Sequence, residues 1–240
     1  MRLLAIETAT DHLGVAVVDE TRLLASYELL AERPHAIELP QAVTRVVQAS
    51  RCGLGDIDAV AVDIGPGSFT GLRIGLAFVK ALVFRMQRPV VGVSSLDVLA
   101  AQLAFSSVAV CPLLDAKQRK VYAALYQAKD GTAQKQSDYL LTTIDELITL
   151  LKPPVVFVGD GVALYREALA KRLGARAHFA SPELWAPRAA TLGRLGLARL
   201  AQGLHDDPST LVPMYLYPHD CSVRLPDQPS RSPAPTAQPA

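Results

Sequence analysis

One short stretch limits what this chain can fold into: Asp63-Ile-Gly-Pro-Gly-Ser-Phe-Thr-Gly-Leu-Arg-Ile-Gly-Leu76. It follows an apolar run typical of a buried strand. Its Gly-Pro-Gly segment predicts a sharp turn, because proline fixes φ and glycine accepts positive φ. A helix is expected next, over about residues 70–86, with Ser68 or Thr70 as its cap. The sequence therefore predicts a strand–turn–helix unit at the centre of the fold.

The predicted helix is apolar around almost its whole circumference, which indicates burial on several sides. Gly71 and Gly75 each cost about 1 kcal/mol relative to alanine, so their four-residue spacing predicts the close approach of another backbone. Two interpretations stay open, namely a core helix and a helix with one side on another subunit. A membrane span is disfavoured, because Arg73 and Lys80 would each cost about 2.5–3.5 kcal/mol there.

Composition excludes several classes of protein. The chain has 240 residues, half of them hydrophobic, which is enough for one large or two small domains. A net charge of +1 provides no global field for nucleic acid. The three cysteines lack metal-like spacing, and the N-terminus turns polar too early for a signal peptide. We expect a soluble cytoplasmic protein without a membrane segment.

Hydrophobic periodicity predicts the same order of elements twice, three strands and then alternating helices and strands. In the first half the expected strands are residues 3–6, 14–18, 23–29, 58–63 and 89–93, and the helices are 35–50, 70–86 and one opening at Ser94 or Ser95. In the second half the expected strands are residues 108–114, 121–127, 136–141, 155–158 and 175–179, and the helices are 145–151, 162–173 and 188–202.

This order implies an α/β fold of mixed sheets with helices on both faces. Repeated twice, it is similar to the two ribonuclease-H-like lobes of the actin, Hsp70 and sugar-kinase (ASKHA) superfamily. We expect the lobes at residues 1–105 and 106–217. Residues 218–240 are rich in proline, serine and glutamine, which predicts a disordered tail.

Four segments together resemble the TsaB (YeaZ) family. The run from Gly65 to Gly75 matches its signature, and Leu4-Ala-Ile-Glu-Thr-Ala-Thr10 matches its first strand and turn. Leu114-Asp-Ala-Lys-Gln-Arg-Lys-Val-Tyr122 and Val212-Pro-Met-Tyr-Leu216 match two later elements. The resemblance covers residues 1 to about 217. Two features depart from the family pattern: Tyr217 stands where the family usually has arginine, and the proline-rich tail is extra.

The resemblance implies an activating, non-catalytic subunit for N6-threonylcarbamoylation of adenosine 37 in tRNAs that read codons beginning with adenine. It implies a heterodimer with the transferase TsaD, which the ATPase subunit TsaE and tRNA then join, and a homodimer when the chain is alone. It implies no required cofactor. TsaD is a paralogue whose two metal-ligand histidines map to Ser95 and Leu99 here. Since neither side chain is a useful ligand, we expect no metal, no catalytic residue, no enzyme activity of the chain alone and no peptidase activity.

Family members pair through two helices of the first lobe. The resemblance places that partner interface on eight residues: Ala36, Leu39, Val43, Val46, Gly71, Gly75, Phe78 and Leu82. On this basis Gly75→Leu should abolish partner binding and leave a folded monomer.

The alternative function is an actin-like ATPase or a sugar-kinase-like phosphotransferase with its own nucleotide site. Its phosphate cleft would use Glu7, Thr8, Thr10, Asp63, Gly159 and Gly161, and weak ATP or ADP binding would follow. The structural interpretation of the same residues is a hairpin whose hydroxyls cap its own backbone, with Asp63 stabilising a turn. No glycine lies in the hairpin before Gly14, and a phosphate hairpin would need one.

Lys117, Arg119 and Lys120 form a small basic cluster. It is either a solvated hairpin or a contact for tRNA phosphates, and the sequence leaves both open.

Overall fold

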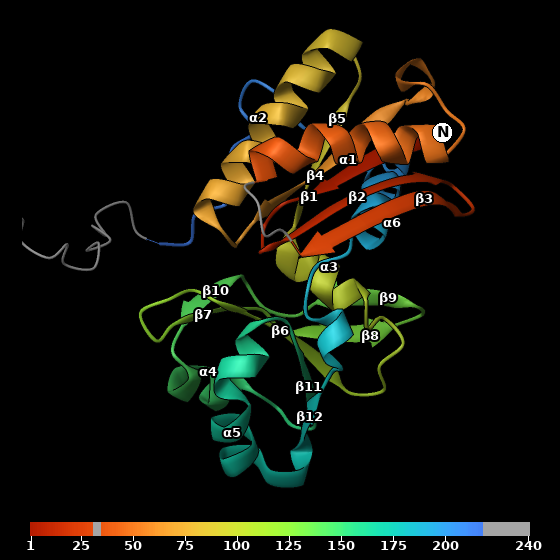
Figure 1. Ribbon diagram of the computed structural model, residues 1–240. Helices are drawn as coiled ribbons and strands as arrows, with labels where there is room; N and C mark the ends of the chain where they lie inside the picture. The colour runs from red at the N-terminus through yellow and green to blue at the C-terminus, as the bar shows by residue number, and fades with distance from the viewer. Residues whose placement is uncertain (31–34, 218–240) are drawn as a thin grey trace, which may run out of the picture.

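The computed structural model describes residues 1–30 and 35–217, which form two lobes (Figure 1). The predicted disordered tail, residues 218–240, lies outside the described residues. Each lobe contains one sheet with helices packed on it, as the sequence predicts. Among the helices of the described residues, none has both the length and the apolar character needed to cross a membrane.

The first lobe is built on a five-stranded sheet in the order β3-β2-β1-β4-β5. An antiparallel meander of β1 (Arg2–Glu7), β2 (His12–Asp19) and β3 (Leu23–Leu30) comes first, and β4 (Ala59–Gly65) and β5 (Val90–Ser94) then join in parallel. The connecting helices are α1 (His35–Ala49), α2 (Phe69–Met86) and α3 (Ser95–Ala101), with a 3-10 turn at Leu54–Asp56. The predicted order of the first half is confirmed.

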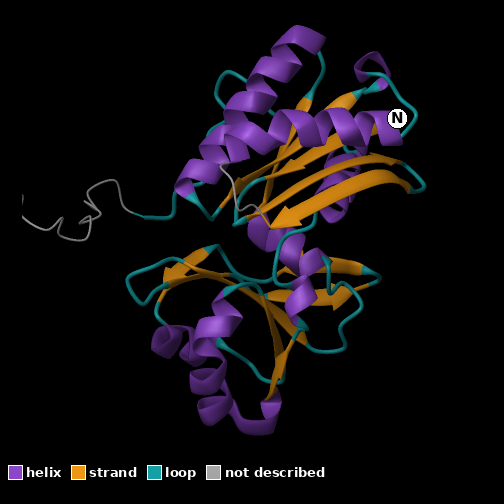
Figure 2. Ribbon diagram, viewed as in Figure 1, coloured by secondary structure: helices purple, strands orange, loops and turns teal. Residues whose placement is uncertain are grey.

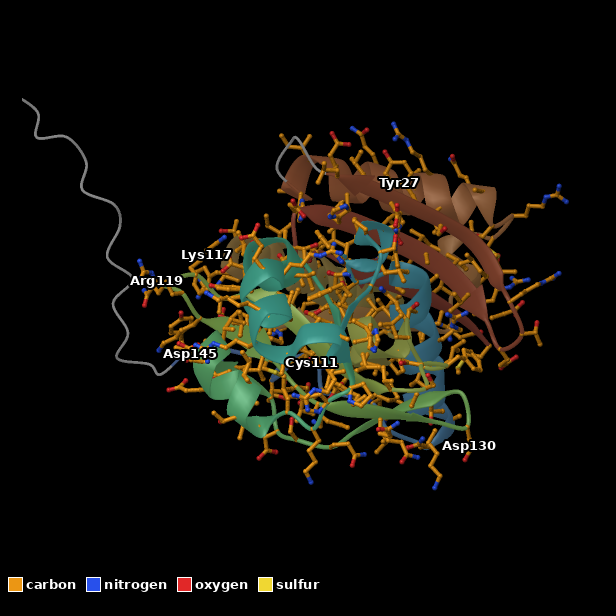
Figure 3. The ribbon with its side chains drawn as sticks, turned by 90° about the horizontal axis from the view of Figure 1, so that it is seen from below. Tyr27, Cys111, Lys117, Arg119, Asp130 and Asp145 are labelled. Carbon is orange, nitrogen blue, oxygen red and sulfur yellow. The ribbon has the colours of Figure 1, made fainter. Side chains whose placement is uncertain are left out.

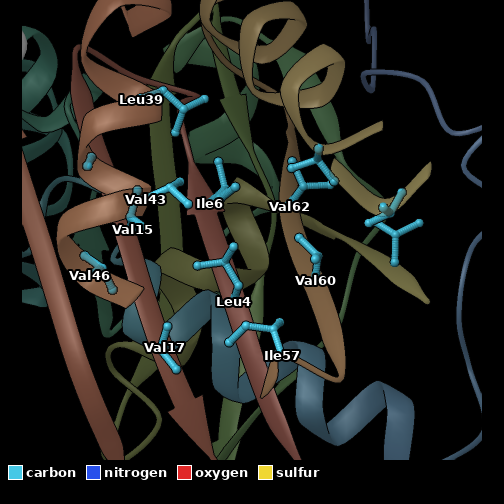
Figure 4. Packing of buried hydrophobic residues seen from close by; sticks show 14 of the residues in the cluster. Leu4, Ile6, Val15, Val17, Leu39, Val43, Val46, Ile57, Val60 and Val62 are labelled. Atoms are coloured by element: carbon cyan, nitrogen blue, oxygen red, sulfur yellow. The ribbon is translucent and has the colours of Figure 1, made fainter. Parts of the chain in front are cut away.

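Both faces of this sheet are covered, which explains why its central strands are apolar at nearly every position. On one face, α1 and α2 pack against alternate strand residues such as Leu4, Ile6 and Val15 (Figure 4). On the other face, Leu3 and Ala5 pack in a cluster with residues of α6 (Ala189–Ala201). The sheet therefore lies between two layers of helix.

The second lobe repeats the order of the first and adds a hairpin. Its sheet runs β10-β7-β6-β11-β12, and the added hairpin pairs with β6. The strands are β6 (Ala109–Asp115), β7 (Val121–Ala123), β8 (Tyr126–Lys129), β9 (Thr132–Lys135), β10 (Leu140–Thr142), β11 (Val155–Val158) and β12 (Ala177–Phe179). The helices are α4 (Ile144–Leu150) and α5 (Gly161–Leu173), with 3-10 turns at Gly174–Arg176 and Pro182–Leu184 before α6.

Two predicted strands of this lobe are wrong in detail. The predicted strand 121–127 is split, because the Leu125 N–H bonds to Ser137 Oγ at 3.0 Å rather than to a neighbouring strand. The predicted strand 136–141 overlaps β10 only at its end, and β9 was not predicted. Asp130 and Gly131 both take positive φ in the turn between β8 and β9. An Asp-Gly pair is a strong hairpin signal, so the sequence held the information for this turn.

The two lobes exchange one helix each. Helix α3 follows the first sheet in sequence, yet its Leu96 and Leu99 pack in the cluster of Val110 and Tyr126 on the second sheet (Figure 2). Helix α6 lies within the range predicted for the second lobe and packs on the first sheet. These two helices therefore pack on the sheet of the lobe to which their sequence range does not assign them. The predicted lobe boundary at residue 105 stays a prediction.

A carboxylate of α3 reinforces this exchange. Asp97 accepts hydrogen bonds from the Tyr126 hydroxyl at 2.6 Å and from the Tyr139 hydroxyl at 2.7 Å. Both tyrosines belong to the second lobe. Two hydrogen bonds to one charged acceptor are stronger than neutral ones, so they fix α3 on the second sheet.

The start of α2 is held against the chain's own backbone. Ser68 is the cap, since its Oγ accepts the Gly71 N–H at 3.2 Å, and Gly65 takes a φ of 97° in the turn before it. A Cβ on Gly71 would overlap the Thr8 carbonyl oxygen, and a Cβ on Gly75 would overlap the Thr8 hydroxyl. The predicted close approach is therefore confirmed, but the segment that approaches is the turn after β1 and not another subunit.

Gly71→Ala should destabilise the protein by about 1–3 kcal/mol, because its methyl group would be forced into the Thr8 carbonyl. Gly55→Ala is the matched control, since a Cβ there meets no atom within 4 Å, and we expect a change within about 0.5 kcal/mol. Urea denaturation of both variants measures the free energy of unfolding. Equal stability of the two variants would contradict the role of this contact.

Candidate functional site

Two buried carboxyl groups lie near one edge of the first sheet, because Glu7 ends β1 and Asp63 lies two residues before the end of the neighbouring parallel strand β4. Glu7 Oε1 accepts the Ala9 N–H at 2.6 Å, and Asp63 Oδ1 accepts the Gly65 N–H at 2.6 Å and the Ser95 hydroxyl at 2.7 Å. Their other oxygens, Glu7 Oε2 and Asp63 Oδ2, are buried without another partner among the described residues.

Burial raises the pKa of both groups, and the negative charge of Asp63 raises the pKa of Glu7 further, well above its usual range. Hydrogen bonds from Glu7 and Ser95 oppose the effect of burial on Asp63. Both carboxyl groups are thus biased towards the protonated form, Glu7 more strongly than Asp63.

Glu28 on β3 is a half-buried carboxyl group that no sequence motif points to. Its Oε1 accepts the Ala189 N–H at 3.1 Å, at the first residue of α6. Burial raises the pKa of Glu28 to about 7, although the Ala189 N–H and the charge of Arg188 act in the opposite direction. This contact ties an edge strand of the first sheet to a helix that arrives 161 residues later.

The predicted phosphate hairpin is covered by the start of α2. Thr8 is fully buried and Thr10 is 8% exposed. The Ser68 N–H donates to the Ala9 carbonyl at 2.6 Å, and His35 Nε2 bonds to the Thr10 carbonyl at 2.9 Å. These contacts occupy the backbone acceptors and cover both threonines. The geometry thus favours the structural interpretation of Thr8 and Thr10, as a turn packed on its own helix.

Gly159 and Gly161 also have a local structural role. Gly159 takes a φ of 119°, and a Cβ on either glycine would overlap the Leu113 backbone. Between them, Asp160 Oδ1 accepts the Asp115 N–H at 2.9 Å. The glycines let the turn before α5 lie directly on β6. Glu7 and Asp63 are brought together at the edge of the first sheet, whereas Gly159 and Gly161 lie in the second lobe.

Two residues that the resemblance maps to metal-ligand histidines, Ser95 and Leu99, are inside the core. Ser95 is fully buried and donates to Asp63, and Leu99 is fully buried against the second sheet. Across residues 1–30 and 35–217, no group of three or more His, Cys, Asp and Glu side chains is arranged to hold a metal ion.

Five of the eight residues predicted at a partner interface pack within the chain itself, and their place in an interface stays a prediction. Leu39, Val43 and Val46 pack against the first sheet (Figure 4). Gly71 and Gly75 lie against Thr8. The physical reason is that each amphipathic helix needs its apolar stripe to cover its own sheet. Consequently Gly75→Leu is expected to damage the fold rather than to leave a folded monomer.

The opposite faces of α1 and α2 hold a second set of apolar residues. Of the predicted interface, Ala36 is exposed, whereas Phe78 and Leu82 are half-buried and also pack against the core of the first lobe. Other exposed residues of these faces are Ile37, Pro40, Ala77 and Ala81, and Ile37 has 55% of its surface exposed. The two helices contact each other, so these residues belong to neighbouring helices on the outer side of the first lobe (Figure 1). We call this set the outer helix face.

The outer helix face could have been found from the sequence. Ala77 and Ala81 are four residues apart, as are Phe78 and Leu82, so each pair lies on one side of α2. Both pairs differ in position around the helix from Leu72, Leu76 and Val79, which are buried. What the sequence did not reveal is which of the two apolar sides meets the sheet.

Comparison with known proteins gives a consistent result. Residues 29–221 match the family model described as tRNA N6-adenosine threonylcarbamoyltransferase. The chain is 30% identical over 219 residues to the tRNA threonylcarbamoyladenosine biosynthesis protein TsaB of Bacillus subtilis, which covers 90% of this chain and 94% of that protein.

Two solved structures extend this result. A Pseudomonas aeruginosa protein described as similar to peptidase YEAZ superposes with a TM-score of 0.78 and 28% identity, over 90% of this chain and 99% of that one. A ROK hexokinase of Thermus thermophilus has a TM-score of 0.50 and 13% identity, over 85% of this chain and 100% of that one, and it shows similarity of fold alone.

Glu28→Gln keeps an oxygen acceptor for the Ala189 N–H and removes the titrating group. A carboxyl group whose pKa is raised from 4.5 to about 7 by folding makes the protein less stable as the pH rises through that range. We expect the free energy of unfolding of the variant, taken relative to the wild type, to be about 2 kcal/mol higher at about pH 8 than at about pH 5. Urea denaturation at both pH values measures this difference.

The control is Glu167→Gln on the exposed face of α5, which should show no such difference between the two pH values. A gain for Glu28→Gln that is the same at both pH values would show that this carboxyl group does not titrate between them.

Proposed function

Because the chain belongs to the TsaB (YeaZ) family, we propose that it acts in the biosynthesis of N6-threonylcarbamoyladenosine in tRNA as the activating, non-catalytic partner of the transferase TsaD. The product is the modified adenosine 37 of tRNAs that read codons beginning with adenine. TsaE and tRNA join the heterodimer. The observation that carries this proposal is the outer helix face, which is an exposed apolar surface. It lies on a chain that has Ser95 and Leu99 where the resemblance maps the metal-ligand histidines of TsaD.

The outer helix face has the chemistry of a helix–helix interface. Ile37 and Pro40 supply exposed apolar area on α1, and Ala77 and Ala81 place small side chains one turn apart on α2, which allows a partner helix to approach closely. Two helices of TsaD packed on this face would form a four-helix bundle. In the absence of TsaD, a second copy of the chain would cover the same face and form a homodimer.

The alternative of an ATPase or sugar kinase has no comparable support. Thr8 and Thr10 are covered by α2 and α1, and Glu7 and Asp63 are both buried. Weak binding of ATP or ADP stays a prediction, and calorimetric titration of the purified chain with each nucleotide tests it.

Reconstitution tests the proposed function directly. We expect tRNA threonylcarbamoylation by TsaD, TsaE and the enzyme TsaC, which makes the threonylcarbamoyl-adenylate, only when this chain is added, and no product from this chain alone. The measurement is incorporation of labelled threonine into tRNA. Equal incorporation without the chain would sink the proposal.

Ala81→Arg tests the interface, since it places a long charged side chain at an exposed position of the outer helix face and keeps a good helix former. We expect binding to TsaD to weaken by more than about tenfold, because a charge would have to be buried unpaired. Ala163→Arg on the exposed side of α5 is the matched control and should bind as the wild type does. Size-exclusion chromatography with light scattering reports both the complex and the fold, and an unchanged complex with Ala81→Arg would place the interface elsewhere.

A further inference from the structure

The C-terminal segment carries aromatic side chains from one lobe to the other. It leaves α6 and passes the start of α2, where the Met214 N–H donates to the Ile64 carbonyl at 2.7 Å (Figure 1). It then reaches the second lobe, where the Tyr217 hydroxyl donates to the Ala116 carbonyl at 2.8 Å. Tyr215 and Tyr217, only two residues apart, therefore belong to the surfaces of different lobes.

On the first lobe, Tyr215 completes a cluster of one cation and two aromatic rings. The Arg73 guanidinium lies 3.6 Å from the centre of the Phe69 ring, and Arg73 Nε donates to the Tyr215 hydroxyl at 3.0 Å. The Phe69 and Tyr215 rings are 5.5 Å apart. Phe69 is 53% exposed and Tyr215 is 43% exposed, so this arrangement leaves aromatic surface open to solvent.

On the second lobe, Tyr217 lies beside the basic loop that the sequence singled out. The Lys120 ammonium is 5.7 Å from the centre of the Tyr217 ring, and Tyr122 meets that ring edge-on at 6.2 Å. Arg119 precedes Lys120 in the loop and is exposed. Residues 215–217 connect the two clusters along the chain, and we call the two together the cation–aromatic strip: Phe69, Arg73, Arg119, Lys120, Tyr215 and Tyr217.

The backbone of the basic loop is held in an unfavourable conformation. Lys117, Gln118 and Arg119 have φ values of 61°, 51° and 59°, and the turn is closed by a hydrogen bond from the Lys120 N–H to the Lys117 carbonyl at 2.9 Å. Left-handed conformation costs a non-glycine residue about 1–2 kcal/mol, and glycine would avoid that cost. The residues at these three positions have long polar side chains instead of being glycines. Lys117 and Arg119 project from the same outer edge of the molecule (Figure 3). Lys117 is paired with Asp115 at 2.6 Å, so we do not count its charge in the strip.

We propose that the cation–aromatic strip binds a strand of RNA, with Arg73, Arg119 and Lys120 on phosphates and the exposed Phe69 and Tyr215 rings against bases. Cations that alternate with exposed aromatic rings suit a strand that offers phosphates and base faces in turn. The chain has a net charge of only +1, so the attraction comes from this local arrangement and not from a global field. The choice of RNA as the polyanion rests on the proposed function in tRNA modification.

The experiment measures the affinity of the full chain for a tRNA transcript by fluorescence anisotropy over a series of salt concentrations. The strip variant is Arg119→Gln with Lys120→Gln. The matched control is Lys129→Gln with Lys135→Gln, which removes the same charge from β8 and β9, and Lys135 lies over the Tyr139 ring as Lys120 lies over Tyr217. The turn after Lys129, marked by Asp130, lies on the opposite side of the molecule from Arg119 (Figure 3).

We expect the strip variant to bind about tenfold more weakly and its salt slope to fall by about 1.4, since two phosphate contacts are lost, while the control stays within about twofold of the wild type. An equal loss of affinity in both variants would mean that overall charge attracts the RNA. No loss of affinity in either variant would mean that the strip does not bind RNA. Both results overturn the inference.

Phe69→Ala separates RNA from other polyanions. It should weaken binding of the transcript by at least about fivefold with an unchanged salt slope, because a stacking contact is lost, and leave binding of inorganic polyphosphate unchanged. Loss on both ligands, or on neither, would contradict a base contact. Thermal melting of each variant confirms the fold. These readouts do not require TsaD, so the strip can fail while reconstitution succeeds, and the reverse.

Discussion

The contact between the turn after β1 and the start of α2 determines most of what this chain presents to its surroundings. Gly71 and Gly75 let α2 lie directly on Thr8, and the Ser68 N–H bonds to the Ala9 carbonyl. The contact covers Thr8 and Thr10, two residues that the sequence predicted for a phosphate site. It also fixes the rotation of α2 about its axis, which turns Ala77 and Ala81 to the outside. One backbone contact thus covers the turn after β1 and sets which side of α2 faces outward.

The exchange of α3 and α6 gives the second lobe its relation to the first. Each lobe's sheet is covered by a helix that the other half of the chain supplies, so neither half can bury its own core without its neighbour. Asp97 with its two tyrosines and Glu28 with the Ala189 N–H are polar contacts of the same exchange. The C-terminal segment adds a third connection through Tyr215 and Tyr217. The two lobes are therefore joined by both exchanged helices and by the C-terminal segment.

Much of the fold could be predicted from the sequence, because hydrophobic period and caps are local properties. Ser68, Ser94 and Thr143 cap α2, α3 and α4 as the residue types suggest, and the predicted order of elements is confirmed in the first half and, apart from the strands between residues 121 and 142, in the second. The β8–β9 hairpin was missed although Asp130-Gly131 announces it. The site was predicted less well. Residues such as Leu39 and Val43 were recognised as apolar helix positions, but their direction depends on where the sheet lies.

The sequence by itself determined the family signature, the order of most strands and helices, and the presence of Ser95 and Leu99 at the positions that the resemblance maps to metal-ligand histidines. These depend on residue type and short spacing. Only the tertiary structure decided that burial raises the pKa of Glu7 and Asp63, that the glycines of α2 face Thr8, and that Arg73 meets Tyr215 across 142 residues. The physical reason is that burial and pairing are properties of a packed neighbourhood, which forms when distant segments meet and which no local pattern records.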